Sequence, residues 1–288
     1  MFSRFALDES MIILIAAALI PPFYLLYRVY RLDRIEKEPL GLLVLLFFFG
    51  VVSTIPSIFI EMGLGNLLIR IFDNIRLTDF TVNLYYIIDN LICVALVEEG
   101  LKFLFMRLGT WRNKDFNYRF DGIVYAVVVS LGFAAAENVL YVTSNGFSNA
   151  VVRAVTAIPG HCIFGIYMGT YYGWAKMYDK RGLTGRRNFE LFKALAVPTL
   201  LHGIYDYSLT INSDFAFYAF FAYVIILDIM ALNHIRRSAA KDEDITYGSD
   251  TSVSIRPAQG SQQIGSLADL KDTLDHSRSK ENDPFSRK

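Results

Sequence analysis

Two adjacent glutamates and a lysine lie close together in an otherwise apolar stretch of this 288-residue sequence. Glu98 and Glu99 stand four and three residues before Lys102, so on a helix both carboxylates reach the same ammonium group. Adjacent carboxylates in a low-dielectric environment repel each other, and such a pair can exchange a proton with water near neutral pH, as general acid–base catalysis requires. In the alternative interpretation, Lys102 extends to a membrane surface and the glutamates merely accompany it.

Two further apolar stretches carry a carboxylate and an imidazole. Glu137 and Asn138 follow three consecutive alanines, small residues that let a neighbouring helix approach. His161 begins a row of small residues at four-residue intervals, so we expect it to face protein rather than lipid. Each could instead be structural, the pair as a hydrogen-bonding link between helices and His161 as a buried core histidine. The row consists of Gly165, Gly169 and Gly173.

A second histidine has an aspartate on the same helical face. His202 and Asp206 are four residues apart, so the carboxylate can fix the tautomer and orientation of the imidazole. Pro198, one turn earlier, removes a backbone hydrogen bond and could open space for water. A purely structural pair is the alternative.

Carboxylates, imidazoles and an amide inside a dry helix bundle form a combination that can activate water. In a metal-free mechanism one glutamate takes a proton from water, while a histidine or Asn138 stabilises the oxyanion. Alternatively the site holds Zn²⁺, which binds imidazole nitrogen and carboxylate oxygen. The spacing leaves both possibilities open, because the His-Glu-x-x-His signature of zinc proteases is absent. If zinc is used, its expected ligands are His161, His202 and Glu137.

These residues stand out because the rest of the chain carries little charge. The sequence is 53% hydrophobic and 19% charged, its net charge is zero, and residues 40–60 and 122–136 contain no charged side chain. This composition argues against an ordinary soluble enzyme and against a basic nucleic-acid-binding protein. It favours a multi-pass protein in contact with the lipid bilayer, whose apolar runs must be helices.

The apolar runs predict an all-α, polytopic transmembrane helical bundle of about seven spans. Lysine and arginine concentrate in alternate loops, which places the N-terminus outside and the C-terminus in the cytoplasm. Residues 1–238 are predicted to form the transmembrane domain, and residues 239–288 a disordered polar cytoplasmic tail with a short amphipathic helix near 264–275. Residues 63–79 suggest an interfacial helix. The predicted spans are 10–30, 40–61, 81–106, 120–143, 153–176, 192–212 and 214–235.

The predicted span limits place two of the glutamates at different depths. Glu98 falls nearer the cytoplasmic side and Glu137 nearer the outside, by about 10–15 Å at 1.5 Å per residue. Either the limits are off, or a tilt or break in a helix brings the two together, or Glu137 lies outside the site.

Four features, in order along residues 28–235, resemble the PrsW-type intramembrane proteases, which are distantly similar to CAAX-processing and bacteriocin-immunity membrane proteases. Each feature is weak alone, whereas the ordered set on successive spans is fairly specific. The features are the segment 33–39 in the first cytoplasmic loop, Glu98-Glu99-Gly100-Leu101-Lys102, the segment 133–141 around Glu137-Asn138, and the histidines His161 and His202 with Gly203-Ile204-Tyr205-Asp206.

The resemblance implies an intramembrane endopeptidase that cleaves membrane-anchored proteins, including anti-sigma factors in bacteria, and that crosses the plasma membrane several times. Relatives are often called metalloproteases and related families glutamate proteases, so the resemblance leaves the presence of zinc open. It implies Glu98 and Glu99 as the leading catalytic residues, completed by Glu137, His161 and His202 and supported by Lys102, Asn138 and Asp206.

Two other functions fit parts of the sequence. The same carboxylates and histidines could form the relay of a proton-coupled transporter, with broken helices at Pro21-Pro22 and Pro198. No inverted repeat with paired interruptions supports a transporter. A catalytically inactive membrane scaffold is the other alternative.

Overall fold

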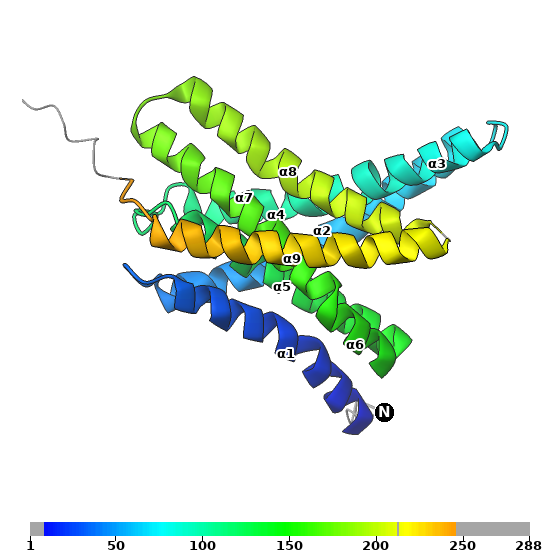
Figure 1. The fold of residues 1–288 in the computed structure, drawn as a ribbon, viewed down its shortest axis with the longest axis horizontal. Helices are drawn as coiled ribbons and strands as arrows, with labels where there is room; N and C mark the ends of the chain where they lie inside the picture. Colours follow the sequence, from blue (N-terminus) through cyan, green and yellow to red (C-terminus); the bar gives the residue numbers. More distant parts are fainter. Residues whose placement is uncertain (1–8, 212, 246–288) are drawn as a thin grey trace, which may run out of the picture. The chain divides into compact units, whose positions relative to one another are not determined.

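The chain folds into a bundle of long helices that run roughly side by side (Figure 1). The computed structural model describes residues 9–211 and 213–245, and these residues contain no strand beyond an isolated bridge between Tyr118 and Asp244. The all-α prediction is confirmed. The elements are α1 (Glu9–Leu32), α2 (Leu40–Phe72), α3 (Asp79–Ile88), the π-helix η1 (Asp89–Ala95), α4 (Leu96–Thr110), α5 (Asp121–Asn145), α6 (Phe147–Val155), α7 (Ala157–Lys180), α8 (Thr184–Thr210) and α9 (Asp214–Ala240).

Six helical segments within the described residues are long and apolar enough to cross a bilayer. One of them, from Asp79 to Thr110, joins α3, η1 and α4, and another, from Phe147 to Lys180, joins α6 and α7. The predicted span at 192–212 falls in α8, whose 27 residues suffice in length but are less apolar than those of the other six segments. The structure is therefore that of a multi-pass membrane protein.

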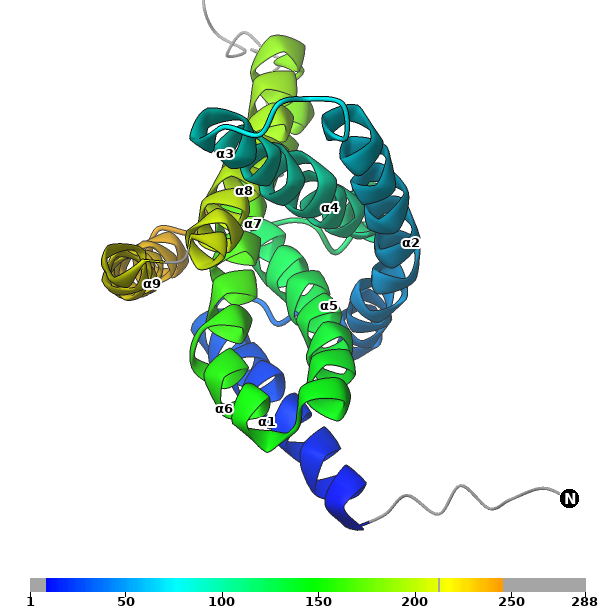
Figure 2. The ribbon, with the colours of Figure 1, turned by 90° about the vertical axis from the view of Figure 1, so that its right-hand side faces the viewer.

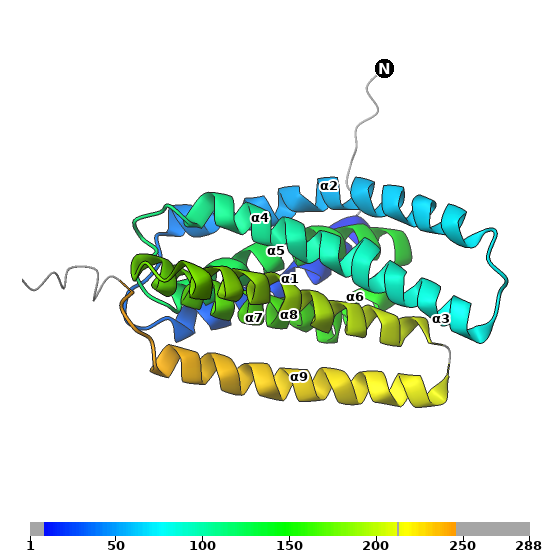
Figure 3. The same cartoon turned by 90° about the horizontal axis from the view of Figure 1, so that it is seen from above.

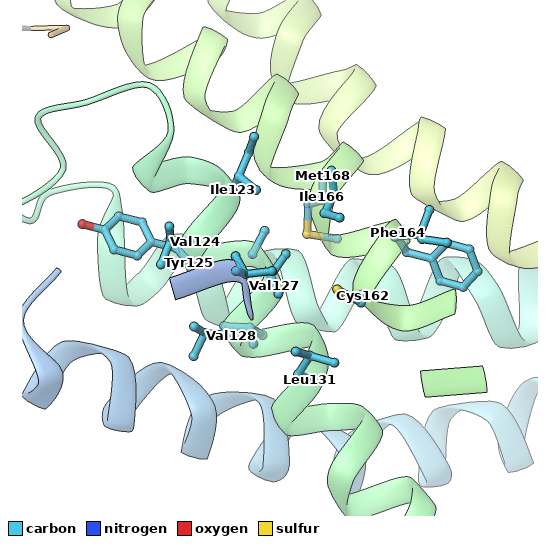
Figure 4. Close-up of a cluster of buried hydrophobic side chains, with 14 of the residues drawn as sticks. Ile123, Val124, Tyr125, Val127, Val128, Leu131, Cys162, Phe164, Ile166 and Met168 are labelled. Atoms are coloured by element: carbon cyan, nitrogen blue, oxygen red, sulfur yellow. The ribbon is translucent and has the colours of Figure 1, made fainter. Parts of the chain in front are cut away.

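Helix α5 occupies the centre of the bundle, with α1, α2, α4 and α7 around it (Figure 2). Every side chain from Asp121 to Ala135 is buried, as expected for a helix that is apolar on all sides. Side chains of α5 gather with those of α7 in the main apolar core (Figure 4). Helix α9, in contrast, lies along one edge of the bundle (Figure 3).

The row of small residues on α7 forms its contact face with α5. A Cβ atom added at Gly169 would lie 2.3 Å from the carbonyl oxygen of Gly122, and one added at Gly165 would lie 3.0 Å from the Cα of Val127. Such contacts require glycine, because even a methyl group would collide with the backbone of α5. The prediction that this row packs closely against protein is confirmed.

The loop between α1 and α2 is held by polar contacts to α5 and to the residues just before it. The Tyr125 hydroxyl donates to Glu38 Oε2 at 2.6 Å, and Asn117 Nδ2 donates to Glu36 at 3.0 Å. Burial raises the pKa of Glu38 to about 7. The segment 33–39 thus fixes where α2 begins relative to α5.

Two predicted boundaries differ from the structure. The predicted interfacial helix at 63–79 is wrong, because residues up to Phe72 continue α2, which extends for about 50 Å. At the other end, α9 continues to Ala240, and the backbone N–H of Ile245 donates to the carbonyl oxygen of Asn117 at 2.8 Å. The first residues of the predicted tail are therefore ordered, and the Ile245 side chain is buried. Residues 246–288, including the predicted helix at 264–275, lie outside the described residues.

Candidate active site

Lys102 of α4 is a fully buried cation that binds both neighbouring glutamates. Its Nζ donates to Glu98 Oε2 at 3.0 Å and to Glu99 Oε1 at 2.8 Å. The side chains of Lys102 and Glu99 have no exposed surface. The contacts that the sequence predicts are therefore present, and Lys102 does not extend to a membrane surface. A buried ammonium group of this kind requires several acceptors.

The same ammonium group reaches a third helix through His161 of α7. Lys102 Nζ lies 3.1 Å from His161 Nδ1, and His161 Nε2 lies 2.9 Å from Glu137 Oε2 on α5. An ammonium group only donates, so Nδ1 accepts, and the ring then carries its hydrogen on Nε2 and donates it to the carboxylate. A continuous chain of hydrogen bonds therefore joins α4, α7 and α5.

His202 of α8 contacts Glu99 and so adds a fourth helix to this chain of hydrogen bonds. Its Nδ1 lies 3.0 Å from Glu99 Oε1, and its Nε2 lies 3.2 Å from Asp206 Oδ2. Phe164, labelled in Figure 4, stacks on the His202 ring with centroids 4.9 Å apart. The predicted pairing of His202 with Asp206 is present, and the ring is held by two carboxylates and an aromatic face.

Glu137 is also bound by Arg153, the first residue of the predicted span 153–176, to which the sequence assigned no role. Arg153 of α6 donates to Glu137 Oε2 at 3.0 Å and to Asn138 Oδ1 at 2.9 Å. The amide nitrogen of Asn138 in turn donates to the carbonyl oxygen of Ala18 on α1 at 2.8 Å. Both polar atoms of Asn138 are therefore engaged, and this residue fixes the position of Arg153.

The glutamates of α4 and α5 meet although the predicted spans set them apart in depth. Glu98 lies about 18 Å from the end of α4 at Thr110, and Glu137 about 24 Å from the start of α5 at Asp121. The predicted limit at residue 106 is four residues short of the helix end, which accounts for about 6 Å of the mismatch. The hydrogen bonds through Lys102 and His161 nevertheless join Glu137 to Glu98, so Glu137 belongs to the site.

The π-helix η1 and a glycine of α8 explain how His202 comes so close to α4. Single turns of π-helix occur often at functional sites, and η1 ends three residues before Glu98. Gly203 faces this turn, where an added Cβ would lie 2.6 Å from Leu91 Cδ1 and 3.1 Å from Leu91 Cα. The absence of a side chain at Gly203 therefore lets α8 approach η1 and brings its neighbour His202 to Glu99.

The site opens into a cavity of about 1030 Å³. Glu99 and Lys102 lie behind its wall, whereas Glu98 is on it. Glu61 of α2, the last residue of the predicted span 40–61, also lines the cavity. An acidic residue in an apolar run was the signal that could have identified it. The ionisable side chains on the wall are those of Glu61, Glu98, Glu137, Arg153, His161, His202, Asp206 and Asp214.

Three of the side chains are arranged so that they could hold a metal ion. Glu98, Glu99 and His202 each offer one ligand atom, and these atoms lie within 4.8 Å of one another, as no other group does among the described residues. Glu99 Oε2 is buried without a partner, and Asp206 supports the far side of the His202 ring. Three protein ligands with a carboxylate behind the histidine fit a catalytic zinc site. The set shares only His202 with the ligands predicted from the sequence, since His161 and Glu137 bind each other.

Sequence similarity to known proteins identifies the family of this chain. Residues 38–231 match the family described as PrsW family intramembrane metalloprotease. The chain belongs to this family. It is 32% identical to Protease PrsW of Oceanobacillus iheyensis over 79% of this chain and 97% of that protein. It is 33% identical to Protease PrsW of Bacillus subtilis, over 72% and 88% of the two chains, and 32% identical to that of Clostridioides difficile, over 80% and 93%. No solved structure gives a significant match.

Family membership makes this PrsW-family chain a peptidase of the membrane, and it favours the protease hypothesis over the transporter. The structure brings together all eight residues singled out from the sequence: Glu98, Glu99, Lys102, Glu137, Asn138, His161, His202 and Asp206.

Gly203→Ala tests whether the approach of α8 to η1 positions His202. The added methyl group is expected to push α8 away from Leu91, lengthen the contact between His202 and Glu99, and lower kcat/KM for peptide cleavage at least ~10-fold. Gly100→Ala is the matched control, because nothing lies within 4 Å of a Cβ at that position. Equal activity of the two variants would contradict this role of Gly203.

Proposed function

We propose that this chain cleaves membrane-anchored proteins, anti-sigma factors among them, in the plasma membrane. The observation that carries the proposal is a glutamate on a cavity wall, Glu98, backed by a buried ammonium group and an oriented histidine. The surrounding helices are long enough to span a bilayer, so a substrate segment can enter the cavity without leaving the membrane. The basic loops support an orientation with the N-terminus outside and the C-terminus in the cytoplasm.

Glu98 is the proposed proton acceptor. It takes a proton from water as the water oxygen attacks the peptide carbonyl carbon, and returns that proton to the leaving nitrogen when the carbon–nitrogen bond breaks. The products are a carboxylic acid and an amine, so the atoms balance. Glu99 is absent from the cavity wall and acts as a positioning residue that holds Lys102 and His202.

The developing oxyanion needs a donor on the same wall. Arg153 uses Nε and one terminal nitrogen to bind Asn138 and Glu137, which leaves further N–H groups of its guanidinium for a substrate oxygen. Its position is fixed by both partners, as electrostatic stabilisation of a transition state requires. His161 holds Glu137 and Lys102 in register through its two ring nitrogens.

Zinc is the proposed cofactor, in keeping with the family description as metalloprotease. Glu98, Glu99 and His202 would each hold it through one atom. Glu98 would then keep its second carboxylate oxygen as the proton acceptor, and Glu99 would be a ligand as well as the residue that holds Lys102 and His202. A bound zinc ion supplies Lewis-acid polarisation of water or of the peptide carbonyl. The hydrogen bonds of Lys102 and Asp206 to these three side chains would orient them for that purpose.

Glu98→Gln tests the proton acceptor. The amide keeps the size of the side chain but cannot accept a proton, so cleavage of a co-expressed single-span anti-sigma-factor reporter is expected to fall at least ~100-fold. Asp228→Asn, an equivalent change on α9 outside the cavity wall, is expected to leave cleavage intact. Undiminished cleavage by Glu98→Gln would contradict the mechanism, and a reporter that the wild type leaves uncut would contradict the substrate class.

Metal analysis of purified protein tests the cofactor. The wild type is expected to bind about one zinc per chain, and His202→Ala to lose roughly nine-tenths of it or more, because one of three ligands is removed. His234→Ala, whose imidazole contacts Thr170 outside the site, is expected to retain zinc. A wild type free of metal whose cleavage resists chelators would contradict the zinc assignment.

A further inference from the structure

Glu61, contributed by α2, is one of three glutamates on the cavity wall. It lies on the same wall as Glu98, Glu137 and His202, although α2 contributes none of the other ionisable groups. Its carboxylate accepts a hydrogen bond from the Ser57 hydroxyl one turn earlier. The proposed mechanism gives Glu61 no role.

Each of the other acidic groups on the wall has a compensating charge or dipole within the chain. Glu98 binds Lys102, Glu137 binds Arg153, and Asp206 binds His202. Asp214 lies in the first turn of α9, where the positive end of the helix dipole stabilises a carboxylate. These carboxylates therefore keep a compensating charge or dipole when a substrate fills the cavity and displaces its water.

Glu61 has no directly bonded cation of this kind. It forms no ion pair with any residue that the structure describes, and the Ser57 hydroxyl is its polar contact. A carboxylate at membrane depth is costly unless it is paired. Water in the open cavity can solvate it, but a polypeptide that fills the cavity displaces this water. The carboxylate then needs a cation that arrives with the substrate.

We propose that Glu61 forms the subsite that selects a lysine or arginine side chain of the substrate. The inference rests on the proposed function, in which the cavity receives the substrate chain. Glu61 lies about 31 Å along α2 from Leu40, roughly the thickness of the hydrocarbon core. The selected residue therefore flanks the apolar segment of the substrate at the end away from the loop before α2. Few lysines and arginines occur on the outer side of membrane proteins, so such a residue distinguishes a substrate.

A peptide panel in proteoliposomes tests this assignment. The full-length protein is given synthetic single-span peptides that share an apolar segment and carry Lys, Gln or Glu at one position, scanned through the flank. Both kcat/KM and the dissociation constant are measured. The wild type is expected to prefer the Lys peptide over the Gln peptide at least ~10-fold at one position, since a desolvated charge pair is worth at least that factor.

The variants assign the preference to Glu61. Glu61→Gln is expected to reduce the Lys preference to less than twofold, Glu61→Asp to retain it, and Glu61→Lys to favour the Glu peptide. Asp73→Asn, which neutralises an exposed acid at the end of α2, serves as the control and keeps the preference. The preference is the ratio of kcat/KM for the Lys peptide to kcat/KM for the Gln peptide in one variant. A general loss of activity lowers both values and leaves this ratio unchanged.

Two outcomes overturn the assignment: a wild type without preference for Lys, or a preference that survives in Glu61→Gln. Binding decides the matter even where no peptide is cut, because the Lys and Gln peptides can be compared by affinity alone. A panel that binds with the expected preference but is never cleaved would contradict the proposed substrate class and leave the Glu61 subsite standing.

Discussion

The buried ammonium group of Lys102 is the interaction on which the arrangement of this site depends. It has no exposed surface and is bound by Glu98, Glu99 and His161, from two helices. Through Glu99 the same group reaches His202 on α8, and through His161 it reaches Glu137 on α5. A cation at this depth is tolerated only with such a set of acceptors, and the acceptors in turn need the cation. Four helices are therefore held in register by one network, and the same network supplies the reactive carboxylate.

Close helix packing makes the network possible. The glycine row of α7 lets His161 approach α5, and Gly203 lets His202 approach η1, so both imidazoles reach carboxylates that lie far away in the sequence. The network leaves Glu98 on the cavity wall and Glu99 behind it, which gives two chemically identical neighbours different roles. Glu61, on a helix outside the network, remains available to the substrate.

The sequence was sufficient to predict the helical membrane fold and the family, and it singled out eight side chains that the structure brings into one network, because charged side chains are conspicuous in apolar runs. It also predicted the contacts of Lys102 with Glu98 and Glu99. The contact of His202 with Asp206 was predicted in the same way, since all three follow from helical spacing. It could not predict the pairing of His161 with Glu137 or of His202 with Glu99, which depends on helix tilt and on the exact end of α4. Arg153 and Glu61 were missed because each lies at the end of a predicted span, where a charged side chain is expected. The long extension of α2 was hidden by residues that are apolar enough for either a span or an interface.

The unfolding free energy of Lys102→Met, measured in mixed micelles together with peptidase activity, tests the central claim most directly. Removal of the ammonium group leaves two buried carboxylates without their cation, so a loss of about 3–5 kcal/mol and of activity is predicted. Lys193→Met, which breaks the partly exposed pair with Glu190, should cost less than about 1 kcal/mol. A Lys102→Met protein as stable and as active as the wild type would contradict the claim that this one cation organises the site.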